Sequence, residues 1–240
     1  MSNLLFLVEL GSEVKTIGSE PTQALLRIQC QADLDQLLSE SVVFTLLSGK
    51  EFNPCTLSHA LQTLSLERSL GPKLLGVFPG GRFEQFIPSR PLQCSELSKP
   101  SIGKIVAPML ARVHTLDVPI TKEPQVMMCA RGWLAKFKES DAGAHPVDIR
   151  CTAASVPSQC YPSKITCEEL EEELDFVEEF LRKSQSPVVF SHNDLQEGNI
   201  LLCADYHLNG DGSIRSRSGE NDVVDPLVLI DFEYCSYNYR

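Results

Sequence analysis

A short polar turn between two apolar segments constrains the fold of this chain most. Residues 191–199 read Ser-His-Asn-Asp-Leu-Gln-Glu-Gly-Asn, preceded by Val-Val-Phe and followed by Ile-Leu-Leu. Short apolar runs bounded by polar residues predict strands. Because one strand leads into the turn and another leads out, Asp194 and Asn199, five residues apart, are expected to face the same cleft.

A third apolar segment, residues 227–230, ends at Asp231 and is followed by Phe232 and Glu233. Phosphoryl transfer from ATP needs a carboxylate near the acceptor hydroxyl and oxygen ligands for Mg²⁺. Protein kinases supply them from an Asp, an Asn five residues later, and a second Asp at the end of a following strand. The two segments, in this order and each on its expected strand, therefore predict a kinase-like site.

Other catalytic and metal-binding patterns are absent from the sequence. There is no Gly-x-Ser-x-Gly nucleophile elbow, and Phe44 stands where a phosphate-binding loop before Gly49 and Lys50 would need its first glycine. A calcium loop starting at Asp205 would place Ser216 where a bidentate Glu is required. The remaining histidines lack metal-ligand spacing.

Composition is typical of a globular protein of the cytoplasm. The 240 residues suffice for one large domain or for two small lobes that share a cleft. The net charge of −11 disfavours nucleic acid or an anionic membrane as a partner. Nine cysteines without a Cys-x-x-Cys pair argue against disulfides and zinc. The apolar start lacks a basic segment, and no run approaches the roughly 20 apolar residues of a membrane helix, so membrane insertion is not expected.

The first part of the chain predicts a small strand-rich lobe with one helix. Residues 4–9 and 24–28 have the composition of strands, and residues 76–78 and 83–87 flank Pro-Gly-Gly as in a hairpin. Residues 33–47 place aliphatic side chains on roughly one face, which predicts a helix.

The second part begins with an amphipathic helix. A stripe of apolar residues from Ile102 to Val113 follows Pro100, and Ser101 is expected to cap this helix. Residues 139–163 have no periodicity and are expected to form a loop.

A second helix is predicted after this loop. Thr166 and Glu169 form a capping box, and the helix is expected to end at residues 182–183, which are basic. Its acidic run, residues 168–173, is expected to be a solvated face. The polar segment between residues 202 and 227 is interpreted as a hairpin excursion.

At these segments the sequence resembles the choline/ethanolamine kinase family. Residues 191–199 and 229–240 match the two signature blocks of that family. The resemblance extends over most of the chain, through residues 24–28, 40–44, 67–75 and 81–92. The last block is more similar to choline kinases than to dedicated ethanolamine kinases.

The resemblance implies an α+β, bilobal, protein-kinase-like fold. Residues 1–92 would form the N-lobe with the nucleotide-binding loop and hinge, and residues 93–240 a partial C-lobe with the catalytic and metal-binding motifs. It also implies ATP and Mg²⁺ as cofactors and transfer of the γ-phosphate to choline, the first step of phosphatidylcholine synthesis by the CDP-choline route. Homo- or heterodimers with family members are expected on the same ground.

The resemblance further implies roles for individual residues. Asp194 would accept the proton of the choline hydroxyl, and Asn199 and Asp231 would hold Mg²⁺. Arg27 would steady the ATP phosphates, with Glu40 as its helix partner. The other assignments are the end of the nucleotide-binding loop (Met1, Ser2, Asn3 and Leu4), the hinge beside adenine (Gln85, Phe86, Ile87, Pro88, Ser89 and Arg90), Gln196 near the phosphates, and Glu233 and Tyr234 towards choline.

Three of these assignments have structural alternatives. Arg27 could be a surface residue of its strand, Glu40 a solvated helix residue, and Tyr234 a core residue.

Three departures from the family pattern bear on activity. The sequence begins at Met1, without the glycines that precede Met-Ser-Asn in the family and cradle phosphates. Residues 49–65 interrupt the passage from helix to strand. Arg240 precedes the helices that supply aromatic residues around a trimethylammonium group. Residues 1–240 alone are therefore expected to have negligible choline kinase activity.

Two other functions stay open. One is a truncated, non-catalytic or regulatory chain that pairs with full-length kinase. The other is a kinase that acts on ethanolamine or an aminoglycoside.

Overall fold

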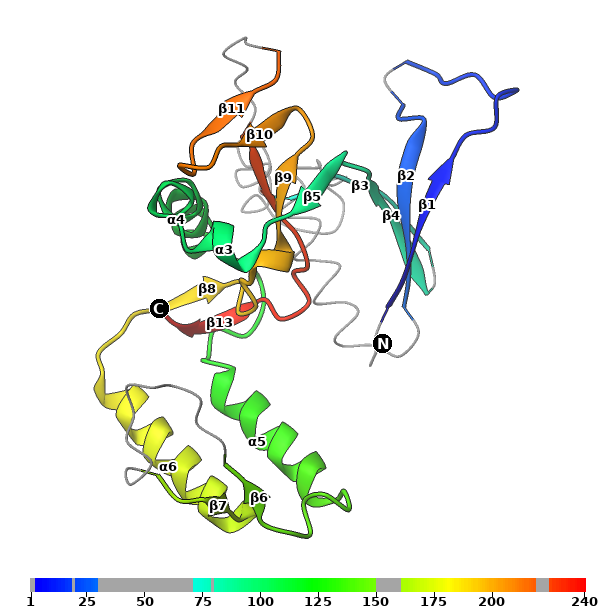
Figure 1. Cartoon of the computed structure of the whole chain (residues 1–240). Helices are drawn as coiled ribbons and strands as arrows, with labels where there is room; N and C mark the ends of the chain where they lie inside the picture. Colours follow the sequence, from blue (N-terminus) through cyan, green and yellow to red (C-terminus); the bar gives the residue numbers. More distant parts are fainter. Residues whose placement is uncertain (1–2, 19, 30–70, 79, 150–160, 219–224) are drawn as a thin grey trace. The chain divides into compact units, whose positions relative to one another are not determined.

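The computed structural model describes residues 3–18, 20–29, 71–78, 80–149, 161–218 and 225–240. The chain divides into two compact units (Figure 1). The first comprises Met1–Ile120 and Phe190–Cys235, and the second comprises Thr121–Val189 and Ser236–Arg240. The division into lobes at residues 92 and 93 stays a prediction.

A four-stranded antiparallel sheet forms the N-terminal part of the first unit. Its strands are β1 (Asn3–Glu9), β2 (Gln23–Gln29), β3 (Leu74–Phe78) and β4 (Gly81–Gln85), in the order β1-β2-β4-β3. Strands β1, β2 and β3 contain the predicted strands in full, whereas β4 starts at Gly81 and ends at Gln85, two residues before the end of the strand predicted at residues 83–87. The predicted helix at residues 33–47 and the interruption at residues 49–65 lie outside the described residues.

A second sheet carries the ends of the predicted catalytic and metal-binding segments. It consists of β5 (Ser89–Pro91), β9 (Ile200–Cys203) and β12 (Leu227–Leu229), in the order β12-β9-β5. The strands predicted at residues 200–202 and 227–230 are present, with Ile230 just outside β12. Side chains of this sheet and of the strand β8 (Val188–Ser191) make up the centre of the core: Phe190, Ile200, Leu227 and Leu229.

Helices α3 (Cys94–Leu97) and α4 (Pro100–His114) follow β5. The stripe predicted on α4 is buried at Ile102, Val106, Met109 and Val113. The prediction that Ser101 caps this helix was wrong, because Lys99 is the N-cap and Pro100 is the first helical residue. The fixed φ of proline and its missing N–H suit that first position, which leaves Ser101 inside the first turn.

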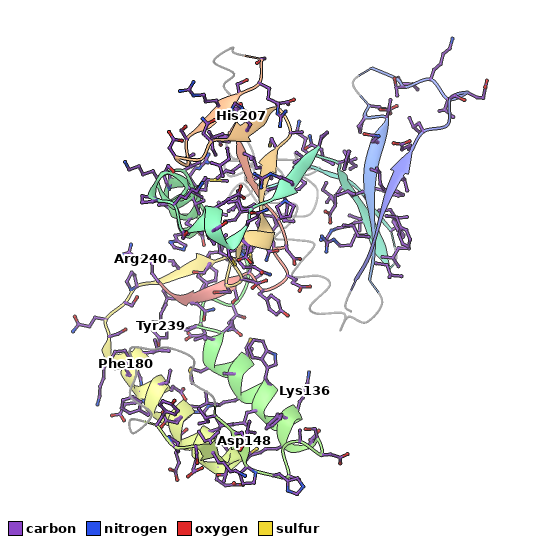
Figure 2. All side chains as sticks on the ribbon, in the orientation of Figure 1. Lys136, Asp148, Phe180, His207, Tyr239 and Arg240 are labelled. Atoms are coloured by element: carbon purple, nitrogen blue, oxygen red, sulfur yellow. The ribbon has the colours of Figure 1, made fainter. Side chains whose placement is uncertain are left out.

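The hairpin excursion predicted before Leu227 is present as β10 (Tyr206–Leu208) and β11 (Ile214–Ser216). Its turn packs on the start of α4, where Lys99 Nζ donates to the carbonyl oxygens of Asn209 and Gly210. His207 lies on β10 and is exposed (Figure 2).

The second unit is built on two helices that lie side by side, α5 (Val126–Lys138) and α6 (Cys167–Lys183) (Figure 1). The capping box of Thr166 and Glu169 is present on α6, as predicted. Short strands β6 (Val147–Asp148) and β7 (Lys164–Ile165) pair between the helices, so residues 139–163 are not wholly loop. The last strand, β13 (Ser236–Tyr239), pairs with β8.

Side chains of this unit are less buried than those of the first. On α5 only Met127 is buried, and Trp133 is 61% exposed. On α6, Phe176 and Phe180 are exposed, and Phe180 projects from the helix in Figure 2. Within the described ranges, no helix has the length and apolar character needed to cross a membrane.

Candidate active site

The predicted catalytic turn folds tightly around Asp194. After Asp194 the chain enters a short 3₁₀ turn, η2 (Glu197–Asn199), which brings Asn199 back to it. Asn199 Nδ2 donates to the main-chain oxygen of Asp194 at 2.8 Å and to its carboxylate Oδ2 at 2.9 Å. The structure thus brings together the two residues whose spacing predicted a common turn.

His192 anchors this turn in the core. Its ring is buried, lies 5.3 Å from the ring of Phe232, and contacts the Ile230 carbonyl oxygen through Nε2 at 2.9 Å. The N–H of Asp194 donates to His192 Nδ1 at 3.3 Å, so Nε2 carries the proton of the neutral ring. Burial lowers the pKa of His192, against smaller opposite effects of the Ile230 carbonyl and of the carboxylates of Asp194 and Asp231.

The predicted metal-binding segment runs directly beside the catalytic turn. The N–H of Ile230 donates to the carbonyl of Asn199 at 3.0 Å, next to Asp231. Asn193 Nδ2 donates to the carbonyl of Tyr234 at 2.7 Å. Main-chain and side-chain hydrogen bonds therefore fix Asp231 relative to Asn199.

Two residues of the site have a left-handed backbone. Asn193 has φ +62° and Asp231 has φ +66°. Asn and Asp tolerate this region better than other non-glycine residues do. The unusual backbone therefore lies immediately before Asp194 and at Asp231 itself.

The carboxylates of Glu233, Asp194 and Asp231 all act electrostatically on Tyr234. The carboxylate of Glu233 is the largest influence that raises the pKa of Tyr234, and burial and the carboxylates of Asp194 and Asp231 add to it. Tyr234 is 46% exposed, which excludes the alternative that it is a core residue. An exposed aromatic side chain thus lies in the negative field of these carboxylates.

The oxygen donors of this site suit Mg²⁺. Asn199 commits its amide NH₂ to Asp194, so its Oδ1 is the end that a cation would use. Asp231 adds a half-buried carboxylate. The described residues contain no group of three or more His, Cys, Asp or Glu side chains placed to hold a metal ion. Few protein oxygens are what Mg²⁺ requires when it keeps several waters and binds phosphates.

Arg27 reaches the same site from β2. Its Nη1 lies 3.8 Å from Asp231 Oδ1, and its side chain is 13% exposed, so it is not a surface residue. Its Nε donates to Glu84 Oε1 at 3.0 Å. The predicted partner Glu40 lies outside the described residues, as do Met1 and Ser2.

The predicted hinge connects the two sheets of the first unit, from the end of β4 at Gln85 to β5 at Ser89. Gln85 bonds to Lys73, and the carbonyl of Pro88 accepts from the N–H of Ala204 at 2.8 Å. Arg90 forms a two-bond ion pair with Glu96, which raises the pKa of Arg90.

Asn3, Leu4 and Gln196 are also assigned to the nucleotide. Asn3 and Leu4 begin β1, opposite Gln29 and Ile28. Gln196 lies on the catalytic turn, where its N–H donates to the carbonyl of Asp194 at 3.1 Å. The sequence assigned no role to His192, Asn193 or Glu84. The spacing of Arg82 and Glu84, two residues apart in a strand, indicates that they share a face, but it does not show that Arg27 lies on that face.

The sequence is similar to known proteins of one family. A family model described as choline/ethanolamine kinase matches residues 56–240. The chain is 41% identical over 255 residues to choline kinase A2 of Caenorhabditis elegans, covering 100% of this chain and 53% of that protein. It is 36% identical over 244 residues to choline/ethanolamine kinase of Mus musculus, covering 100% and 50%. The chain spans about half the length of these curated relatives.

Solved structures of similar fold include Plasmodium vivax ethanolamine kinase, with a TM-score of 0.61, 18% identity, and coverage of 99% of this chain and 55% of that one. Choline kinase from Cryptosporidium parvum gives a TM-score of 0.59 at 22% identity, with coverage of 100% and 57%. At these identities the likeness shows the fold, and it confirms the predicted α+β, protein-kinase-like class. By its sequence match and its fold, the chain belongs to the choline/ethanolamine kinase family of phosphotransferases.

Proposed function

We propose that the protein is an ATP-dependent choline kinase that transfers the γ-phosphate of ATP to the hydroxyl of choline. The contact of Asp194 with Asn199, beside the segment that ends in Asp231, carries the proposal. Family membership alone does not separate choline from ethanolamine as the acceptor.

Asp194 is the proposed base. Its Oδ2 is occupied by the amide of Asn199, so its other oxygen is the one that would accept the proton of the acceptor hydroxyl. The N–H of Asp194 is held by the neutral ring of His192, which fixes the main chain of the base. The turn would thus leave one carboxylate oxygen of Asp194 for the acceptor hydroxyl.

Asn199 and Asp231 would hold Mg²⁺ through Oδ1 and the carboxylate. Held there, Mg²⁺ would supply positive charge against the negative charge that develops during transfer. Arg27, which already lies beside Asp231, would contact the phosphates. Gln85 to Arg90 would line the adenine, with Gln196, Asn3, Leu4, Met1 and Ser2 on the phosphate side.

The surroundings of Tyr234 favour a cationic acceptor. Its exposed ring lies near the carboxylates of Glu233, Asp194 and Asp231. Aromatic faces and negative charge both attract quaternary ammonium groups. Choline fits this environment, and the 41% identity to a choline kinase supports the same acceptor.

The test measures ADP release by the chain and by an extended form that carries the C-terminal half of choline kinase A2 after Arg240. We expect the extended form to release ADP in response to choline, with a higher kcat/KM than for ethanolamine. A preference for ethanolamine would overturn the acceptor. No release with either amine, in a protein that still binds MgATP, would overturn the proposed transfer.

A further inference from the structure

Glu84, on β4, holds two arginines with one carboxylate oxygen. Its Oε1 accepts from Arg27 Nε at 3.0 Å and from Arg82 Nε at 2.6 Å. We infer that Glu84 is a positioning residue for the nucleotide. It accepts a hydrogen bond from Arg27 Nε, so that the terminal nitrogens of Arg27 can face the phosphates of a bound nucleotide. This inference rests on the proposed function, because it concerns the same nucleotide site.

The register of the sheet explains how the three side chains meet. Arg27 lies directly opposite Arg82, and Leu25 lies opposite Glu84. Directly opposed residues of an antiparallel pair share a face, and so do alternate residues of one strand. Glu84 is therefore the diagonal neighbour of Arg27 on one face of the sheet.

Burial makes this contact specific. The side chains of Arg82 and Glu84 are each 4% exposed, and that of Arg27 is 13% exposed. A charge so far from water is costly unless it is paired and hydrogen-bonded. Glu84 is thus held in place from two sides, and its position determines where the guanidinium of Arg27 can lie.

The two carboxylate contacts of Arg27, with Glu84 and with Asp231, differ in length. Among the described residues, Arg27 has a second carboxylate nearby, that of Asp231, whose Oδ1 lies 3.8 Å from Arg27 Nη1. That distance is too long for a hydrogen bond, whereas the contact of Arg27 Nε with Glu84 is within the ordinary hydrogen-bond range. Arg27 therefore has a firm partner at Nε and a loose one at its terminal nitrogens.

A guanidinium held at Nε still presents its terminal N–H groups, which match the geometry of phosphate oxygens. If Asp231 binds a cation, its weak contact with Arg27 can be lost, while the hydrogen bond from Nε to Glu84 keeps Arg27 at the site. A lysine at position 27 has no Nε–H on a planar fork and cannot be held in this way.

The competing explanation is that Glu84 only stabilises the sheet by pairing with Arg82. The two explanations differ in whether the effect of Glu84 on nucleotide binding passes through Arg27. A double-mutant cycle measures this coupling directly.

Calorimetry with MgATP on the full chain tests the inference with Glu84→Gln, Arg27→Lys and the double variant. We expect Glu84→Gln to weaken MgATP binding roughly tenfold, within the range of coupling for contacting residues. We expect it to add little once Arg27→Lys is present. Glu9→Gln, on exposed β1 of the same sheet, is the matched control and should leave affinity unchanged. An equal loss in both backgrounds, or no loss, overturns the inference.

A nitrogen-15 NMR measurement of the Arg27 Nε–H needs no nucleotide. We expect this proton to be protected from exchange with water in the native chain and in Glu9→Gln, and to lose protection in Glu84→Gln. Rapid exchange in the native chain overturns the positioning contact even if Glu84→Gln does not fold. Protection of Arg27 without any binding of MgATP by the native chain would instead contradict the proposed function and leave the contact standing.

Discussion

The side chain of Asn199 uses its two ends differently. Its Nδ2 donates to the carbonyl and the carboxylate of Asp194, which leaves Oδ1 at the opposite end of the planar amide. One residue can thereby orient the proposed base and offer an oxygen to a cation. Single substitutions around it should separate proton acceptance from nucleotide binding.

Asp194→Asn, in the extended form, should abolish choline phosphorylation with little effect on ATP affinity. The substitution removes the proposed base and keeps the size of the side chain. Loss of a general base typically costs about 10²–10⁴-fold in rate. Steady-state kinetics with calorimetry of MgATP would check both parts. Retention of more than roughly a tenth of native kcat would contradict the role of Asp194.

Asp231→Ala should lose Mg²⁺-dependent nucleotide binding, because a metal carboxylate is removed. The left-handed backbone at Asp231, with φ +66°, complicates that variant, since alanine is strained there. Asp231→Asn tolerates the same backbone and removes only the charge. We expect both variants to bind ATP equally with and without Mg²⁺ in calorimetry. An unchanged Mg²⁺ effect in Asp231→Asn would count against Asp231 as a ligand.

Stability in Mg²⁺-free buffer should fall as the pH drops below about 6.5, the usual pKa of histidine. Burial lowers the pKa of His192 in the folded chain, so the unfolded chain binds this proton first. The neutral ring of His192 therefore adds to the free energy of unfolding above the pKa that His192 has in the unfolded chain. This contribution is lost as the pH falls towards the lower pKa of the folded chain. Urea unfolding between pH 7.5 and 5 would measure it. His192→Gln should flatten this slope, and exposed His207→Gln should leave it intact; the reverse result would refute the assignment.

At the level of elements, a helix could be predicted where the sequence contains a cap or a buried apolar stripe. The capping box of Thr166 and Glu169 places the start of α6 because both groups act within one turn. Helix α5 gave no such signal, since Gln125 makes no side-chain cap and only Met127 is buried. A helix without a cap or a buried stripe cannot be distinguished from a loop by periodicity.

The approach of Gly71 to the metal-binding segment is a contact that sequence could not reveal. A Cβ at Gly71 would lie 2.7 Å from Phe232 Cε2 and 3.2 Å from the carbonyl oxygen of Leu229. Phe232 also packs on His192, so a shift of its ring would reach the catalytic turn.

Gly71→Ala should therefore destabilise the chain by about 1–3 kcal/mol, as overpacking does. Gly103→Ala on α4 is the control, because a Cβ there would have open space. That substitution should instead raise helix stability by roughly 0.5–1 kcal/mol. Denaturant unfolding compares the two, and equal stability of both variants would show that the space around Phe232 adapts.

On the scale of the molecule, the sequence predicted contacts within one turn better than contacts between distant segments. Asp194 and Asn199 share one turn, so their spacing alone places them together. Arg27 and Glu84 are 57 residues apart and meet only through sheet register, which depends on how β2 and β4 pair. The sequence therefore predicted a helix partner for Arg27, while the described residues place a strand partner beside it.

The pairing of β5 with β9 has a mechanical consequence for the proposed adenine hinge. The N–H of Leu92 donates to the carbonyl of Ile200, and the N–H of Ala204 to that of Pro88, so both ends of β5 are tied to β9. Since β9 begins directly after Asn199, a local opening of the hinge would also release the strand that holds this amide in place. Hinge and metal-binding turn would then open and close as one cooperative segment. Adenine bound at the proposed hinge would thereby steady the Asn199 oxygen at the start of the adjoining strand β9.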